Sequence, residues 1–259
     1  MTALRHILFP VIAVCAFCAA AAQASCRQAL ALGLDVSGSV DEREYRLQTD
    51  GLAEALRDPE VQAAFLALPS LPVRLMIFEW SGRTDQRVII PWTDIKDTDE
   101  LWRIADILNG MGKAGSQDGG TAISSAMIFG ARSLQAQSDC LQWTLDLSGD
   151  GPGNTGLHPR DVKGAVLDGV TINGLVLLPF SRANTSKNLT NVKTLEDYYR
   201  SFVLRGPGSF TEKAGSFAEF GSAMRRKLIR ELQLPNLSLD LGPTTANRGP
   251  GAKDARRNQ

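Results

Sequence analysis

Short apolar segments alternate with amphipathic helical segments along most of this chain, and this alternation limits the fold more than any other feature. Residues 30–35 (LALGLD) are an unbroken apolar run, typical of a strand that is buried on both faces. The next segment, residues 41–56, places Tyr45, Thr49 and Leu52 on one face at helical spacing. Strands that alternate with helices predict an α/β fold, in which helices cover both faces of a single, mostly parallel sheet.

The same pattern continues along the chain. Further strands are expected at residues 73–80, 87–92, 141–147 and 170–178, with a short edge strand at 209–213. Further helices are expected after Asp97, at residues 122–134 and 161–168, and from Ser216 onward. The short, turn-rich link at residues 81–85 predicts that the second and third strands form an antiparallel hairpin at the edge of the sheet. Residues 181–195 are polar, and their pattern indicates no particular element.

The two ends of the chain do not follow this pattern. Residues 7–22 contain no strongly polar side chain and lead to Ala22-Gln23-Ala24, so residues 1–24 are expected to be a secretory signal peptide. Two alternatives remain. One is an uncleaved anchor, although the apolar run is shorter than the ~20 residues that a membrane span needs. The other is a lipoprotein acylated at Cys26. Residues 235–259 are rich in Pro, Gly, Asn and Arg, which predicts a disordered tail. Residues 25–234 are then one domain of a periplasmic or secreted protein.

The overall charge excludes one class of function. The chain has 28 Lys+Arg and 28 Asp+Glu, so its formal net charge is zero. Without a basic excess it has no general means of neutralising phosphates, which excludes a general nucleic-acid binder.

Oxygen-bearing side chains gather where expected strands end. Asp35, Ser37 and Ser39 follow the first strand, Thr121 ends a loop with five glycines, and Asp150 follows a later strand in Ser-Gly-Asp-Gly. The carboxyl ends of parallel strands meet at one edge of the sheet, where ligands bind. Oxygen donors without His or Cys suit Mg²⁺, Mn²⁺ or Ca²⁺ rather than Zn²⁺ or Cu²⁺. Helix capping and turn formation are the simpler interpretation of the same residues.

This order of residues resembles the metal-ion-dependent adhesion site of von Willebrand factor A domains. That site reads D-x-S-x-S, then Thr, then Asp, on three separate loops. The resemblance spans about residues 28–232 and implies a doubly wound, Rossmann-like sheet. More narrowly, DVSGSVDEREYRLQ from Asp35, FEWSG from Phe78 and PWT from Pro91 look like an uncharacterised bacterial family of secreted proteins with this fold. That narrower resemblance implies no known activity.

The resemblance also implies roles for the site residues. Ser37, Ser39 and, in some states, Thr121 would bind the ion through their hydroxyls, while Asp35 and Asp150 would hold it mainly through bound waters. An open coordination position would take an Asp or Glu carboxylate of a protein partner, because largely neutral ligands leave a dication under-neutralised. The implied function is a metal-dependent binding module, not an enzyme.

The resemblance further implies a disulfide. Only Cys26 and Cys140 remain after signal cleavage, nine residues before Asp35 and ten before Asp150. If the two strands are adjacent and parallel, as the fold implies, both cysteines lie near the opposite end of the sheet from the aspartates. Neighbouring strands are ~4.8 Å apart, which suits a disulfide. Two free thiols, or a lipidated Cys26, are the alternatives.

Two other functions stay open at this point. A metal-dependent hydrolase needs a general base near the ion, and Glu79, at the end of an expected strand, is the only candidate. Glu79 either lies near the metal or pairs with Arg83 or Arg87, and the pairing is the interpretation we favour. A scaffold of the same fold that binds no metal is the second alternative.

Overall fold

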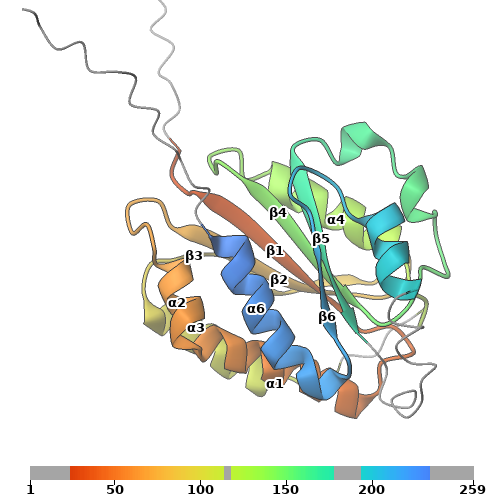
Figure 1. The fold of residues 1–259 in the computed structure, drawn as a ribbon, viewed down its shortest axis with the longest axis horizontal. Helices are drawn as coiled ribbons and strands as arrows, with labels where there is room; N and C mark the ends of the chain where they lie inside the picture. The colour runs from red at the N-terminus through yellow and green to blue at the C-terminus, as the bar shows by residue number, and fades with distance from the viewer. Residues whose placement is uncertain (1–23, 114–117, 178–193, 234–259) are drawn as a thin grey trace, which may run out of the picture.

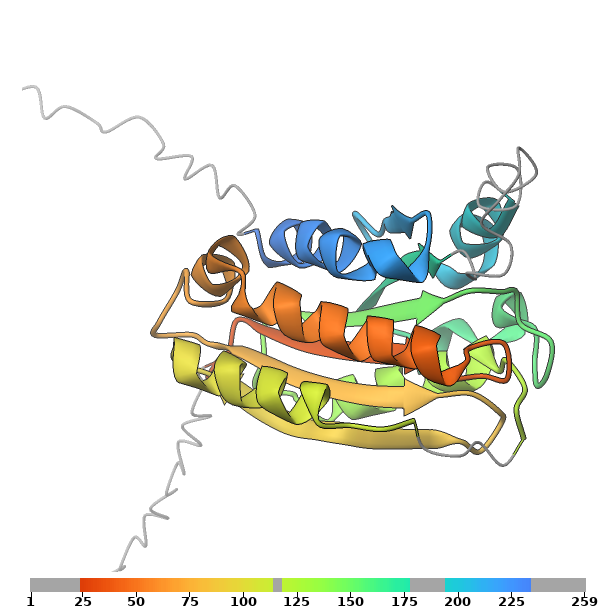
Figure 2. The same cartoon turned by 90° about the horizontal axis from the view of Figure 1, so that it is seen from below.

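The computed structural model describes residues 24–113, 118–177 and 194–233. They form one six-stranded sheet with helices on both faces (Figures 1 and 2). The strands are β1 (Gln28–Asp35), β2 (Val73–Trp80), β3 (Gln86–Ile95), β4 (Trp143–Gly149), β5 (Val170–Leu177) and β6 (Thr211–Ala214), in the spatial order β3-β2-β1-β4-β5-β6. Every neighbouring pair is parallel except β2 and β3. The predicted fold class and edge hairpin are therefore confirmed.

The helices divide between two apolar cores. The helices are α1 (Glu42–Arg57), α2 (Pro59–Phe65), α3 (Thr98–Asn109), α4 (Ile123–Gln135) and α6 (Phe220–Leu232). All of these except α4 pack on one face of the sheet, and α4 packs on the other. β1 supplies both cores, because alternate residues of a strand point to opposite faces: Leu30, Leu32 and Leu34 belong to the first core, and Ala29 and Ala31 to the second.

Three local predictions differ from the structure. Residues 161–168 form no α-helix: two short 3-10 turns, η1 (Pro159–Asp161) and η2 (Gly164–Val166), lie there instead, since a segment containing Gly164 and ending at Gly169 is poorly suited to a helix. Helix α2 was not predicted, although Asp58 caps it and Pro59 begins it. Ser216 makes no side-chain cap, and a 3-10 turn, η5 (Phe217–Glu219), precedes α6.

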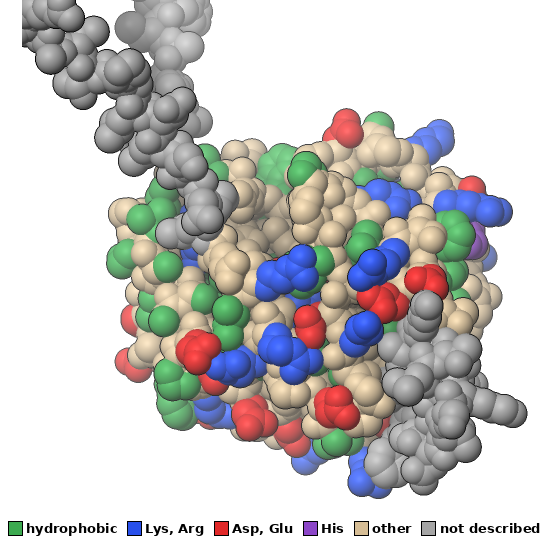
Figure 3. Space-filling model, viewed as in Figure 1, with side chains coloured by type: hydrophobic (Ala, Val, Ile, Leu, Met, Phe, Trp, Pro, Cys, Tyr) green, Lys and Arg blue, Asp and Glu red, His purple; other side chains and the backbone are tan. Residues whose placement is uncertain are grey.

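Several predictions lie outside the described residues. They include all but the last residue of the signal peptide at residues 1–24, most of the polar segment 181–195, and the tail at residues 235–259. No described helix has both the length and the apolar character that a membrane span requires. On the face that carries α6, basic and acidic side chains are intermingled (Figure 3), as the zero net charge leads one to expect.

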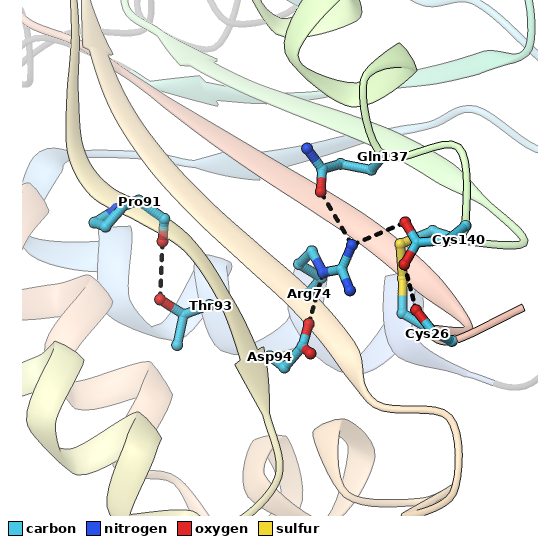
Figure 4. A network of polar contacts seen from close by, with 9 residues as sticks. Cys26, Arg74, Pro91, Thr93, Asp94, Gln137 and Cys140 are labelled. Carbon is cyan, nitrogen blue, oxygen red and sulfur yellow. Dashed lines mark hydrogen bonds and ion pairs between the residues drawn. A yellow bond between two sulfur atoms is a disulfide. The ribbon is translucent and has the colours of Figure 1, made fainter.

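The predicted disulfide between Cys26 and Cys140 is present at the amino ends of the central strands (Figure 4). The two Cα atoms are 4.6 Å apart, and the pair extends the parallel pairing of β1 with β4. Beside it, Arg74 of β2 donates hydrogen bonds to Asp94 of β3 (2.6 Å) and to Asp139 (2.9 Å). One covalent bond and a set of ion pairs therefore hold the strands together at this end of the sheet.

Candidate metal centre

The loop after β1 is held tightly against its surroundings. Asp35 is the last residue of β1 and is fully buried. Its Oδ1 accepts a hydrogen bond from the backbone N–H of Ser37 (2.8 Å), and its carbonyl accepts one from Gln48 of α1 (3.1 Å). Lys113 donates to the carbonyls of Ser37 and Val40, which closes the loop from the other side. Hydrogen bonds from Gln48 and Lys113 therefore hold this loop from two other segments of the chain.

The two serines connect this loop to the end of β4. The Ser37 and Ser39 hydroxyl oxygens are 3.1 Å apart, and Ser39 donates a hydrogen bond to Asp150 Oδ1 (2.8 Å). Ser37 is fully buried and Asp150 is 6% exposed. Four of the five predicted site residues thus lie together at the carboxyl ends of two neighbouring central strands, where the parallel register brings them.

Thr121 reaches the same edge on a third loop. The backbone N–H of Gly38 donates to the Gly119 carbonyl (2.9 Å), and a Cβ on Gly38 would lie 3.0 Å from that oxygen, so a side chain there would crowd the approach of the two loops. Asn154 accepts a hydrogen bond from the Thr121 N–H (2.8 Å) and donates one to its hydroxyl (3.4 Å). The Thr121 loop is therefore bonded both to the serine loop and to the segment after Asp150. Sequence analysis did not identify Asn154, since no motif marks it.

The electrostatics of this edge favour a cation. Burial, followed by repulsion from the Asp150 carboxylate, raises the pKa of Asp35 to about 7, although hydrogen bonds from Ser37 and from the backbone of Asp150 oppose the rise. Asp35 Oδ2 is buried and has no hydrogen-bond partner among the described residues. A buried carboxylate oxygen of this kind is costly unless a proton or a cation meets it. The five side chains fit a hard dication, because they supply two carboxylates and three hydroxyls and neither imidazole nor thiolate.

Other kinds of metal site find no support in the part of the chain that the structure describes. There, no group of three His, Cys, Asp or Glu side chains is placed to hold a metal ion. His158 accepts a hydrogen bond from the Arg160 N–H at the start of η1 and packs against Phe202. His158 therefore caps the 3-10 turn η1.

Glu79 is engaged elsewhere. Tyr45 donates a hydrogen bond to its Oε1 (2.6 Å), and Arg87 forms an ion pair with its Oε2 (2.7 Å). The pairing with Arg87 that we favoured is therefore confirmed. Both oxygens of the one candidate general base are occupied by other side chains.

Sequence comparison identifies a family. Residues 25–236 match the family described as Protein of unknown function (DUF1194). No curated protein matches the sequence.

Structure comparison identifies the fold. A von Willebrand factor type A protein from Catenulispora acidiphila is 11% identical with a TM-score of 0.53, over 80% of this chain and 43% of that one. The pilus adhesin SpaC from Lactobacillus rhamnosus GG is 14% identical with a TM-score of 0.52, over 81% and 31%. Proximal thread matrix protein 1 from the mussel byssus, with a zinc-occupied MIDAS motif, is 14% identical with a TM-score of 0.51, over 80% and 48%. This chain covers less than half of each, and such identities show a shared von Willebrand factor A fold alone.

Proposed function

The chain belongs to the family described as Protein of unknown function (DUF1194), and from that starting point we propose that it is a metal-dependent binding module outside the cytoplasm. In this proposal Asp35, Ser37, Ser39, Thr121 and Asp150 hold a divalent cation, Mg²⁺, Mn²⁺ or Ca²⁺, which captures an Asp or Glu carboxylate of a protein partner. A bound dication would supply positive charge at an open coordination position.

The observation that carries the proposal is that four of the five residues are hydrogen-bonded together at one sheet edge, which the Thr121 loop also reaches. Asp35, Ser37, Ser39 and Asp150 are joined by hydrogen bonds of 2.8 to 3.1 Å, and Asn154 attaches the Thr121 loop to the segment after Asp150. Capping explains these residues less well. Asp41, not the serines, caps α1, and its side chain accepts a hydrogen bond from the Glu44 N–H.

The chain's own residues prepare this edge without rearrangement. The hydrogen bond from the Ser37 N–H to Oδ1 orients the Asp35 carboxylate, and Gln48 holds the backbone carbonyl of the same residue. Ser39 holds Asp150 Oδ1 beside the serine loop. Because the donors are already in place, binding an ion requires little ordering of the protein.

Two further observations support a location outside the cytoplasm. The Cys26–Cys140 disulfide suits an oxidising compartment. The apolar segment before Ala22-Gln23-Ala24 predicts export.

The first test is titration of the purified chain with Mg²⁺ and Mn²⁺ by calorimetry and thermal melting. We expect both ions to bind and to raise the melting temperature, because a ligand at a hundred times its Kd stabilises the folded state by about 2.7 kcal/mol. Asp35→Ala should abolish both effects. Asp161→Ala is the control, since Asp161 is largely exposed and lies on η1. An unaltered melting temperature at saturating metal would contradict the proposal and leave a scaffold of this fold.

The second test concerns the partner. Envelope proteins should be retained by the immobilised chain in Mg²⁺ and released by chelator, and Asp150→Ala should retain none of them. Retention that survives both chelator and Asp150→Ala would refute metal-dependent capture. Turnover of esters or phosphate esters that requires Mg²⁺ and Glu79 would favour a hydrolase instead, although Glu79 is bonded to Tyr45 and Arg87.

A further inference from the structure

Tyr199 reaches the candidate metal centre from the crossover that follows β5. It begins the π-helical segment η4 (Tyr199–Val203) and is fully buried. A Cβ on Gly174 of β5 would lie 2.5 Å from the Tyr199 ring, and a Cβ on Gly149 of β4 would lie 2.2 Å from its hydroxyl oxygen. Glycines in two neighbouring strands therefore leave the space that this side chain fills on one face of the sheet.

The hydroxyl of Tyr199 and the carboxylate of Asp35 face the same small space. The Cβ position on Gly149 lies 2.2 Å from Tyr199 Oη and 3.3 Å from Asp35 Oδ2, so the two oxygens cannot be farther apart than the sum of these distances. Both oxygens are buried, and neither has a hydrogen-bond partner among the described residues. An unsatisfied buried polar group costs about 1–3 kcal/mol, so two at one place require an explanation.

We propose that Tyr199 is a positioning residue of the metal centre, and that its hydroxyl and Asp35 Oδ2 are bridged by one enclosed water. A buried water needs at least two polar partners, which these oxygens supply. Two hydrogen bonds of ~2.8 Å to one water, at a near-tetrahedral angle, place their outer oxygens roughly 4.5 Å apart, which is below the upper limit on the separation of these two oxygens. The bridge holds the second carboxylate oxygen of Asp35 in place, as the Ser37 N–H holds the first. This inference rests on the proposed function, because it assigns Tyr199 to the same site.

The electrostatics agree with a donor role for Tyr199. Burial, and then the nearby carboxylates of Asp35 and Asp150, raise the pKa of the Tyr199 hydroxyl well above its usual value. The hydroxyl therefore keeps its proton over the physiological range and can donate it to a hydrogen bond. A phenylalanine would fill the same glycine-lined space without that proton, so packing alone does not account for a tyrosine here.

The test compares the full chain with Tyr199→Phe and with the control Tyr45→Phe. Tyr45 is also fully buried, but its hydroxyl donates to Glu79, which is not one of the five residues of the candidate metal centre. The affinity for Mn²⁺ is measured from the electron paramagnetic resonance signal of the free ion. The spectrum of bound Mn²⁺ reports the symmetry of its surroundings. Urea unfolding in the presence of chelator reports the stability of each variant.

We expect Tyr199→Phe to weaken Mn²⁺ binding about 10- to 100-fold, the usual effect of removing a group that orients a metal ligand. It should also change the spectrum of bound Mn²⁺ without lowering stability in chelator. Tyr45→Phe should do the reverse, losing stability and keeping Mn²⁺ affinity and spectrum. If Tyr199→Phe binds Mn²⁺ within twofold of the wild type and with the same spectrum, the role of Tyr199 is refuted while the proposed function stands. If the wild type binds no Mn²⁺, the proposed function fails first and this inference falls with it.

Discussion

Two buried groups of carboxylates adjoin strand β4, and their surroundings differ. Asp146, inside β4, is 2.8 Å from the ammonium of Lys227, which also pairs with Glu231, and all three side chains are buried. Asp35, at the end of β1, has Asp150 beside it and no cationic side chain bonded to it among the described residues. The Asp146 group contains a cationic side chain, Lys227. Within the part of the chain that the structure describes, the Asp35 group has none, which suits a site for an external cation.

The charges in each group explain the contrast. Burial is the largest influence on both Asp35 and Asp146, and it raises the pKa of each to about 7. At Asp146 the repulsion from Glu231 is opposed by Lys227, whereas at Asp35 the repulsion from Asp150 is opposed only by hydrogen bonds. The buried carboxylate of Asp146 is therefore paired with a lysine, whereas, in the described part of the chain, that of Asp35 is not. The variants below test this difference.

Lys227→Met should have the largest effect. It leaves Asp146 and Glu231 buried without a cation, and removing one partner of a buried ion pair costs about 3–5 kcal/mol. Urea unfolding should show this loss. Arg226→Met is the control on the same helix: its pair with Glu212 is half exposed, so the expected change is under about 1 kcal/mol. Equal effects of the two variants would show that the buried cluster is not what distinguishes the two regions.

The pH dependence of stability should be intermediate in size. The folded pKa of Asp146, about 7, lies above its ordinary value of 3.8, so between these pH values the folded chain binds more protons than the unfolded chain. The free energy of unfolding in chelator should therefore fall as the pH rises from about 4 to about 7. Asp146→Asn should make that fall shallower. An unchanged slope from pH 4 to 7 in this variant would contradict the raised pKa.

Asp35→Asn should have the smallest effect on stability. In chelator the free energy of unfolding should stay within about 1 kcal/mol of the wild type or rise, because no cation loses its partner and the amide oxygen can still accept from the Ser37 N–H. The same variant should lose the stabilisation by Mg²⁺. A large loss of stability in chelator would show that the Asp35 carboxylate is compensated within the chain, as Asp146 is.

The sequence predicts the sheet and the site edge well because both depend on local patterns. Apolar runs such as residues 30–35 mark buried strands, and Asp35 and Asp150 follow two of them directly. The polar partners that the sequence did not predict come from distant segments. Lys227 meets Asp146 across 81 positions, and Tyr199 follows a polar segment with no readable periodicity. Such contacts depend on how helices and crossovers pack on the finished sheet, which local patterns do not encode.

The Cys26–Cys140 disulfide joins the chain near the starts of β1 and β4, whose other ends carry Asp35 and Asp150. A force applied at residue 25 is therefore transmitted to β1 and β4 together and cannot peel β1 away from β4. If a partner is held at the opposite edge, the tension runs lengthwise along two hydrogen-bonded strands. Moving these two strands past β2 and β5 would require many backbone hydrogen bonds to break at once, so such a load would meet more resistance than one that peels a single strand from the sheet.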